Sequence, residues 1–225
     1  MSQIKNRELK KRIIDISYEH HLSHLSSSLT SLDIINDIFS NKKEDEKFVL
    51  SSGHSGLALY VALENYWKAR GRNIDAEYLL EHCGIHPDRK NAYDYIDCST
   101  GSLGQGLPIA CGMALADKSR NVYCLISDGE CAEGSIWEAI RLAYENHLTN
   151  LKIYVNINGW GAYKKIDVAN LIEDLTIWKK RGVNIEICET NIKLFEDVVD
   201  GLKGQSAHYY QLTEDDHIAL TGILE

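Results

Sequence analysis

The sequence predicts an α/β fold, a parallel sheet flanked by helices, and three observations carry this prediction. Residues 121–127 (NVYCLIS) and 151–157 (LKIYVNI) form continuous apolar runs, which are typical of parallel strands buried on both faces. Residues 134–147 between them place apolar side chains at helical spacing. The alternation of strand and helix then repeats toward the C-terminus. Strand, helix and strand at this spacing predict a right-handed crossover within one parallel sheet.

The first part of the chain is predicted to be helical. Residues 6–21 carry apolar side chains at helical spacing among charges, which predicts an amphipathic helix. The serine-rich run SHLSSSLTS interrupts this pattern, and Thr30 and Asp33 then stand three residues apart before IINDIF. This is a capping-box pattern, and it predicts that a second, short helix begins there.

A strand and two helices are expected next. Residues 47–50 (KFVL) contain three consecutive apolar residues and end in a small-residue turn, which predicts a short strand. Residues 57–70 predict a helix that Gly71 stops, and Asp75 can cap a further helix that Gly84 closes.

The second half repeats the α/β pattern. A glycine-rich loop, STGSLGQGL, leads into a helix whose alanines and glycine allow close backbone approach to a neighbour. After the strand at 151–157 we expect a helix at about 168–181, a strand at 184–188, a helix at 191–203 and a strand at 207–213.

The composition indicates a globular chain without attraction for nucleic acid. Its 225 residues are 44% hydrophobic and 25% charged, enough to bury a core, and we expect one domain over residues 1–225. The net charge of −9 provides no basic field for a polyphosphate backbone, so small molecules or proteins are the expected partners. The six cysteines are scattered, no apolar leader precedes the charged start, and no membrane-spanning run is present. We therefore expect a cytoplasmic protein.

Two polar residues stand at the ends of successive predicted strands. Asp128 follows the first apolar run and Asn158 follows the second. Ligands of open α/β sheets bind at this edge, so both side chains can face one crevice. A carboxylate and an amide oxygen suit Mg²⁺ or Ca²⁺, which would bridge to a phosphate-bearing group beside Gly129 and Gly159. Each residue is also an ordinary turn residue before glycine, so a plain turn stays open as the alternative.

The stretch SDGECAEGSIWEA, followed by NLKIYVNINGWG, resembles the thiamine diphosphate signature, a Gly-Asp-Gly box with an asparagine further along the chain. The resemblance implies thiamine diphosphate as cofactor, held through a divalent cation, Mg²⁺ or Ca²⁺. It also implies that Asp128, Asn158 and the backbone carbonyl of Trp160 bind the cation, with Gly129 next to the cofactor. Ser127 stands where the family usually has glycine, a mild change because serine is small.

Four further stretches are similar to transketolase motifs and occur in the family's order: HLSHLSSSLTSLDI, FVLSSGHSGLALY, CGIHPD and STGSLGQGL. The resemblance implies catalytic roles for His24, His54 and His86. His54 would lie near the cofactor diphosphate, and His86 would face the hydroxyl groups of the donor. Gly101 and Leu103 fall on positions that line the cofactor.

Glu133 is assigned by the same resemblance. In the family this glutamate joins a carboxylate network across a dimer interface that links two active sites. An acid at the start of a helix is also favoured by the helix dipole, by a few tenths to about 1 kcal/mol. The adjacent Glu130 and Cys131 have no family role, and we expect them at the surface. Six other histidines are expected at the surface or as satisfied core residues: His20, His21, His82, His147, His208 and His217.

The resemblance covers only one part of a transketolase. In the family a second, pyrimidine-binding domain supplies a glutamate that activates the cofactor, and 225 residues leave no room for it. The resemblance therefore implies the N-terminal subunit of a split transketolase, with a C-terminal subunit that carries the pyrimidine domain, in a dimer of heterodimers. Together they would transfer a two-carbon ketol unit from a ketose donor to an aldehyde acceptor, both small sugars.

Two alternatives stay open. A 2-oxo-acid decarboxylating or acyloin-forming subunit shares the metal-binding box, although GHSG, IHP and GSLGQG favour transketolase. A non-catalytic interaction subunit could have retained the fold. Its best support is the change beside His24, where Ser23 and Leu25 replace the family's glycine and proline. The intact Asp128 and Asn158 argue against it.

Overall fold

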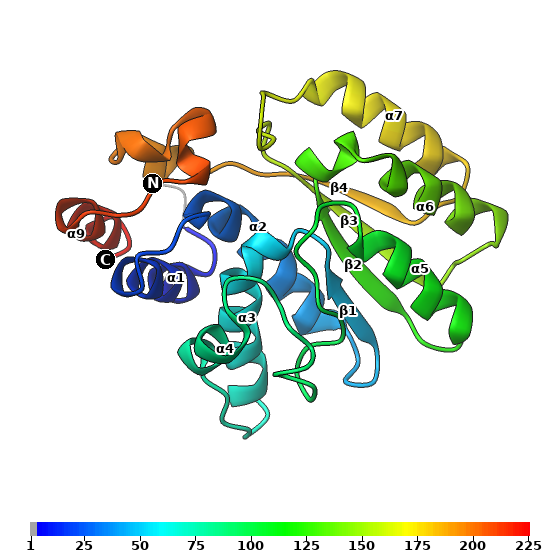
Figure 1. Cartoon of the computed structure of the whole chain (residues 1–225), viewed down its shortest axis with the longest axis horizontal. Helices are drawn as coiled ribbons and strands as arrows, with labels where there is room; N and C mark the ends of the chain where they lie inside the picture. The colour runs from blue at the N-terminus through cyan, green and yellow to red at the C-terminus, as the bar shows by residue number, and fades with distance from the viewer. Residues whose placement is uncertain (1–3) are drawn as a thin grey trace.

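The computed structural model describes residues 4–225 and shows a central sheet with helices on both faces (Figure 1). Among these residues the sheet has four parallel strands in the order β1-β2-β3-β4, which is also their order along the chain. The strands are β1 (Lys47–Leu50), β2 (Val122–Ser127), β3 (Leu151–Ile157) and β4 (Ile185–Glu189).

The helices are α1 (Arg7–Glu19), α2 (Leu25–Asn41), α3 (Gly56–Lys68), α4 (Ala76–Cys83), α5 (Gly106–Ala116), α6 (Gly134–Glu145), α7 (Val168–Lys180), α8 (Lys193–Glu196) and α9 (Glu214–Gly222). Single 3-10 turns are η1 (Gly53–Ser55), η2 (Gly129–Ala132), η3 (Asp200–Leu202) and η4 (Gly204–His208). The predicted α/β class and the parallel connection from β2 through α6 to β3 are confirmed.

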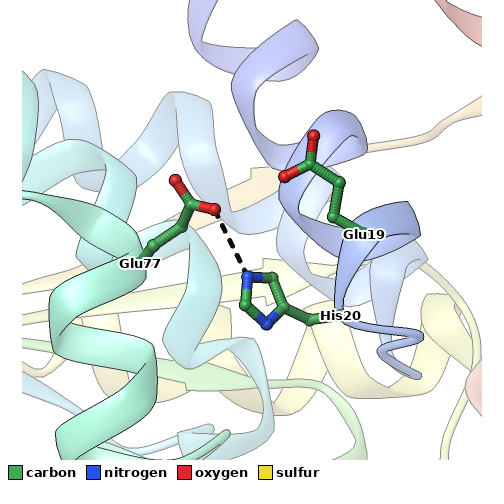
Figure 2. A group of neighbouring side chains, drawn as sticks. All are labelled: Glu19, His20 and Glu77. Atoms are coloured by element: carbon green, nitrogen blue, oxygen red, sulfur yellow. Dashed lines mark hydrogen bonds and ion pairs between the residues drawn. The ribbon is translucent and has the colours of Figure 1, made fainter.

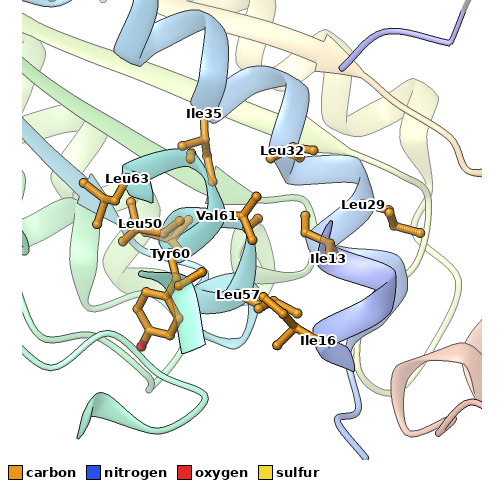
Figure 3. Close-up of a cluster of buried hydrophobic side chains, with 14 of the residues drawn as sticks. Ile13, Ile16, Leu29, Leu32, Ile35, Leu50, Leu57, Tyr60, Val61 and Leu63 are labelled. Carbon is orange, nitrogen blue, oxygen red and sulfur yellow. The ribbon is translucent and has the colours of Figure 1, made fainter. Parts of the chain in front are cut away.

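The sheet separates two hydrophobic cores. Leu125 points to the core under α1, α2, α3, α4 and α9, whereas its neighbours Cys124 and Ile126 point to the core under α5, α6 and α7. All three side chains are 0% exposed, so the strand is buried on both faces, which explains its continuous apolar sequence. Figure 3 shows the first core where side chains of α1, α2 and α3 meet Leu50 of β1.

Several predicted elements agree with the structure. The first helix, the strand at 47–50 and the helix that follows it appear as α1, β1 and α3. Asp75 caps α4 by accepting hydrogen bonds from the backbone N–H groups of Glu77 and Tyr78, at 2.9 and 3.0 Å. Gly84 closes that helix with a positive φ of 76°.

The predicted capping box at Thr30 is wrong. Helix α2 already begins at Leu25, so Thr30 lies inside it and its hydroxyl donates to the carbonyl of Ser27 at 3.1 Å. Asp33 accepts instead from the ammonium of Lys10 at 2.7 Å. The serine-rich run becomes helical because its small side chains, including Ser28, are buried against neighbouring elements, and tertiary packing overrides a weak intrinsic propensity.

The C-terminal predictions are also corrected. The helix expected over 191–203 is broken into α8 and η3, and the strand expected over 207–213 does not form. That stretch is the end of η4 followed by irregular chain, and the aromatic pair Tyr209–Tyr210 explains why its sequence resembles a strand. Helix α9 was not predicted, although Thr213 and Asp216 form a reciprocal capping box at its start.

No helix within residues 4–225 combines the length and apolar character that a bilayer crossing requires.

Candidate active site

The carboxyl ends of β2 and β3 border a cleft of about 180 Å³. It collects the predicted site residues from separate parts of the chain, with Glu133 as the exception. The predicted residues that line it are His24, His54, His86, Gly101, Leu103, Asp128, Gly129, Asn158 and Trp160. Their convergence follows from the parallel sheet, which brings the loops after its strands to one edge.

Asp128 lies at the floor of this cleft, where it is 1% exposed. Its Oδ1 accepts the backbone N–H of Gly129 at 2.9 Å, and its Oδ2 accepts those of Asn158 and Gly159 at 3.0 and 2.7 Å. Burial raises the pKa of the Asp128 carboxyl to about 6, while these backbone bonds oppose the rise. The carboxylate therefore ties the loop after β2 to the loop after β3.

The loop after β3 is folded tightly around Asn158. The Asn158 side-chain oxygen accepts the backbone N–H of Trp160 at 2.9 Å, and Gly159 has a φ of +87° that favours glycine. A side chain on Gly129 would come within 3.3 Å of the Gly161 Cα, so the two loops approach each other closely. Asp128, Asn158 and Trp160 therefore line one cleft, and carboxylate, amide and backbone oxygens are a donor set that suits a hard divalent cation.

The glycine-rich loop before α5 forms another wall. A side chain on Gly53 would meet the backbone of Thr100 and Gly101 at 2.9 Å, so the turn before His54 and this loop touch backbone to backbone. The ring of His86 lies over Gly101, within 3.4 Å of the point that a Cβ there would occupy. A Cβ at Gly101 would make only an ordinary van der Waals contact with this ring, and His86 and Leu103 both line the cleft.

Three imidazole rings cluster in the cleft. The ring centroid of His24 lies 5.3 Å from that of His54 and 5.2 Å from that of His208, and His54 and His208 are 5.7 Å apart. Burial, reinforced by the neighbouring histidines, lowers the pKa of His54 to about 3 and that of His24 to about 4. Burial also lowers the pKa of His208. All three rings are therefore neutral at pH 7.

His24 is held in an unusual conformation. Its φ of 63° places it in the left-handed region just before α2, and its backbone N–H donates to the carbonyl of His208 at 3.1 Å. Its Nδ1 is buried without a hydrogen-bond partner within residues 4–225, and so is the hydroxyl of Ser52. An unsatisfied buried ring nitrogen at a cleft is an available contact for a polar ligand.

His208 was expected to be a surface or satisfied core residue, and this expectation is wrong. It reaches the cleft because η4 packs against α2, and the exposed Tyr209 beside it lines the same cleft. No spacing or motif in the sequence indicates this contact, since it depends on how the C-terminal segment folds back. His217, in contrast, is a satisfied structural residue: its Nε2 lies 2.8 Å from Asp15 Oδ1.

The segment after Asp128 also differs from expectation. Glu130 and Cys131 were expected at the surface, but they are 0% and 8% exposed. Glu133 is exposed at the start of α6, makes no side-chain capping bond and does not line the cleft. Its role across an interface therefore stays a prediction.

A second group of possible metal ligands lies between α1 and α4. Ligand atoms of Glu19, His20 and Glu77 fall within 4.8 Å of one another, and His20 Nε2 lies 3.3 Å from Glu77 Oε1 (Figure 2). The guanidinium of Arg12 donates to the other oxygen of Glu77 at 2.9 Å. The guanidinium of Arg12 already pairs with the Glu77 carboxylate, and none of these residues lines the cleft. We therefore interpret the group as a surface ion-pair network.

Comparison with known proteins connects this cleft to a family. Residues 33–170 match the family model for the transketolase, thiamine diphosphate binding domain. The chain is 40% identical to the transketolase of Homo sapiens over 147 residues, which cover 61% of this chain and 22% of that protein. It is 30% identical to one subunit of the apulose-4-phosphate transketolase of Phocaeicola vulgatus over 176 residues, which cover 69% of this chain and 60% of that protein.

The fold has matching solved structures. A crystal structure of transketolase from Campylobacter jejuni superposes with a TM-score of 0.72 at 20% identity, over 98% of this chain and 43% of that one. The chain thus spans about a fifth of the length of the full transketolases that it resembles in sequence, 22% for the human protein. Fold, cleft and family model agree: the chain belongs to the transketolase family, in which it matches the thiamine diphosphate binding domain.

Proposed function

We propose that this chain is the diphosphate-binding subunit of a split transketolase, which transfers a two-carbon ketol unit from a ketose donor to an aldehyde acceptor. One observation carries the proposal. Loops from distant parts of the sequence, each bearing a transketolase-like motif, bring their histidines, glycines and oxygen ligands to a single cleft. The transketolase names of the relatives favour ketol transfer over a 2-oxo-acid decarboxylating or acyloin-forming role.

The residues present fit thiamine diphosphate with a divalent cation. We assign the cation, Mg²⁺ or Ca²⁺, to the Asp128 carboxylate, the Asn158 amide oxygen and the backbone carbonyl of Trp160, because hard oxygen ligands suit these ions. We place the diphosphate beside Gly129, which lines the same cleft, and the unpartnered Nδ1 of His24 provides a further polar contact. When bound, thiamine diphosphate supplies the electron sink needed to cleave the bond beside a ketose carbonyl.

The protein's own residues would orient the sugars. His24 and His54 are neutral in the cleft, so each ring nitrogen without a proton can accept a hydrogen bond from a sugar hydroxyl and hold that hydroxyl in place. His86 stands exposed at the rim, over Gly101, where it can contact the donor. Leu103 and Gly101 form an apolar part of the wall of the same cleft. We propose His24, His54 and His86 as the catalytic histidines, and His208 as a further ring that packs against His24 and His54.

We propose that activity needs a second chain that carries the pyrimidine domain. The support is the similarity to a protein that is itself named as one subunit of a transketolase. A dimer of such heterodimers would bring Glu133, exposed at the start of α6, to an interface between active sites. We further treat residues 1–225 as one diphosphate-binding domain, since its two cores share the strands of one sheet. All six cysteines are free thiols, which supports a reducing compartment, the cytoplasm.

The test is to purify the chain with the partner that accompanies it in the cell and to titrate thiamine diphosphate with Mg²⁺ by calorimetry. We expect saturable binding that Asp128→Ala abolishes, because it removes the only buried carboxylate among the assigned ligands. Asp174→Ala, at an exposed aspartate of α7, is the matched control and should bind as wild type does.

Enzymatic assays of the same complex separate the alternatives. Ketol transfer between sugars, without release of CO₂ from a 2-oxo acid, supports the proposal. Release of CO₂ would favour the decarboxylating alternative. No cofactor binding by the complex would favour a non-catalytic interaction subunit and would refute the proposal.

A further inference from the structure

Glu130 is a buried carboxylate for which the proposed reaction assigns no role. It lies in η2, two residues after Asp128, and is 0% exposed. Its nearest polar partners are the hydroxyl of Ser51 and the backbone N–H of Gly104, which donate to Oε1 at 2.6 and 2.9 Å. The backbone N–H of Ser127 donates to Oε2 at 3.0 Å. Each of these partners is a donor, a pattern that a carboxylate satisfies and an uncharged amide does not.

These partners come from three different segments of the cleft. Ser51 follows β1 and begins the turn that carries His54, Gly104 follows Leu103 in the glycine-rich loop, and Ser127 directly precedes Asp128. None of the three partners is close to another in sequence, so Glu130 is the point at which the segments are joined. A single side chain thus connects the loops that bear a histidine, an apolar wall and a cation ligand.

The packing around this junction leaves no room for adjustment. A side chain on Gly106 would lie 2.5 Å from the Ser51 Cα, and one on Gly104 would lie 2.7 Å from the Glu133 Cβ. Gly104 is also held from its other side, where the hydroxyl of Ser135 donates to its carbonyl at 2.8 Å. The glycine-rich loop is therefore fixed between the turn after β1 and the segment that starts α6, with Glu130 at the centre.

We propose that Glu130 is a positioning residue for the cofactor cleft, which holds the loops of His54, Leu103 and Asp128 in register by accepting hydrogen bonds from all three. It does not touch the cofactor or the sugars in this proposal. It acts through Ser51, Gly104 and Ser127, as residues behind metal ligands do when they orient them. The inference deepens the proposed function and rests on it for the identity of the ligand, while the junction itself is a property of the chain alone.

Glu130→Gln tests the junction with almost no change in shape. In whichever orientation the new amide settles, its NH₂ group faces the backbone N–H of either Gly104 or Ser127, so two donors oppose each other. Ser51→Ala is a milder variant that removes one donor and keeps the carboxylate. Glu173→Gln makes the same chemical change at an exposed position of α7 and serves as the matched control.

The first readout is hydrogen exchange of the free full-length chain. We expect Glu130→Gln to speed exchange at residues 51–54 and 101–106 by on the order of tenfold, the effect of losing a buried hydrogen bond, and to leave β3 and α7 unchanged. The second readout is the complex with its partner. There the affinity for thiamine diphosphate with Mg²⁺ should weaken about 10- to 100-fold, with turnover at saturating cofactor affected less than the cofactor KM. Ser51→Ala should shift both readouts in the same direction by less.

If Glu130→Gln exchanges its amide hydrogens at residues 51–54 and 101–106 at the wild-type rate, the inference is overturned. If that variant fails to fold, Ser51→Ala decides, and wild-type exchange together with wild-type cofactor affinity would overturn it. A wild-type complex that binds no thiamine diphosphate would refute the proposed function, and the exchange data would then judge the positioning role of Glu130 alone.

Discussion

Burial sets the charge of the cleft histidines. The pKa of His54 falls to about 3 and that of His24 to about 4, chiefly because burial disfavours the charged ring and also because the rings oppose one another's charge. Neutral imidazoles keep a free ring nitrogen that can accept a hydrogen bond from a hydroxyl. The same environment makes protonation of the cleft costly, and this has a measurable consequence for stability.

We expect His24 and His54 to lower the stability of the folded chain as the pH falls from about 6.5 toward 4, a contribution that the Asp128 carboxyl opposes because its pKa is raised to about 6. An unfolded histidine binds a proton near pH 6.5, whereas His24 and His54 stay neutral until about pH 4 and 3, so acid favours the unfolded state in this window. Each fully buried ring adds a slope of up to about 1.4 kcal/mol per pH unit, and solvent screening reduces the contribution of the partly exposed His24. Above pH 6.5 these rings contribute no pH dependence.

Urea unfolding between pH 4.5 and 7.5 measures this slope. His54→Asn should flatten it relative to wild type, since the variant has no ring to protonate. His147→Asn is the control, because His147 is exposed with a φ of 52° that asparagine tolerates, and it should keep the wild-type slope. Equal slopes for wild type and His54→Asn would contradict the expectation.

His24 also stores backbone strain. Its φ of 63° is costly for a residue with a Cβ, by roughly 1–2 kcal/mol, and glycine escapes this cost. We expect His24→Gly to unfold with a free energy about 1 kcal/mol higher than His24→Ala, although both variants lose the ring and most of the turnover. Chemical denaturation of the two variants gives the comparison. A less stable glycine variant, the usual order in helices, would show that the strain is not there.

At the scale of elements, the cleft depends on how closely α5 and its glycine-rich loop approach β1. The helix begins at Gly106, which packs against Ser51, and continues through Gly112, whose surroundings are open. The two glycines of one helix therefore serve different purposes, and only the first is required by contact.

Gly106→Ala should destabilise the chain by about 1–3 kcal/mol, because its Cβ would meet the Ser51 Cα at 2.5 Å and the backbone must move. Gly112→Ala should instead stabilise it by up to about 1 kcal/mol, since nothing lies within 4 Å and alanine favours the helix. Thermal unfolding of both variants checks the opposite signs. A Gly106→Ala variant as stable as Gly112→Ala would mean that this contact is looser than the structure shows.

The elements that could be predicted are those whose pattern is local. The strands β2 and β3 are buried on both faces and appear in the sequence as apolar runs, and the Asp75 cap is indicated by its residue type. The start of α2 could not be predicted, because its serines are helical only through burial. Residues 207–213 were predicted wrongly because aromatic side chains are typical of strands, and no local signal shows that the segment folds onto α2 instead.

At the scale of the whole molecule, the C-terminal helix supports the cleft from a distance. The ring of His217 in α9 stacks on Tyr18 of α1 at 4.5 Å. Before α9, the amide of Gln211 donates to the carbonyl of His21 at 2.7 Å, and the carbonyl of His208 accepts from the backbone of His24. Residues 204–222 thus begin at the wall of the cleft and end in α9, and the packing of α9 on α1 holds this wall in place.

Leu220→Ala should loosen that anchor. Leu220 is 0% exposed, and removing a buried leucine side chain costs about 2–5 kcal/mol. We expect lower stability in urea, faster hydrogen exchange at residues 204–211, and weaker cofactor binding because the wall with His208 becomes mobile. Ile218→Ala, at a 60% exposed position of the same helix, should leave all three properties unchanged. Stability lost without faster exchange at 204–211 would separate α9 from the cleft.

The candidate site could be predicted where motifs identify it, and could not where only the fold does. Asp128, Asn158 and His54 stand in recognisable stretches, and the cleft contains them. The places of His208 and Glu130 become clear only from the folded structure. His208 reaches the cleft because a distant segment folds back. Glu130 is a charged residue that is buried because its carboxylate finds hydrogen-bond donors in other segments, such as Ser51.

The strand order of the sheet matches the order of synthesis. Because β1, β2, β3 and β4 are neighbours in sequence order, each strand can pair with its predecessor as it leaves the ribosome, without waiting for a distant partner. The wall that carries His208 is translated after all four strands. A nascent chain can therefore assemble its sheet step by step, yet the wall of the cleft that carries His208 is incomplete until that later segment has emerged and folded back onto His24.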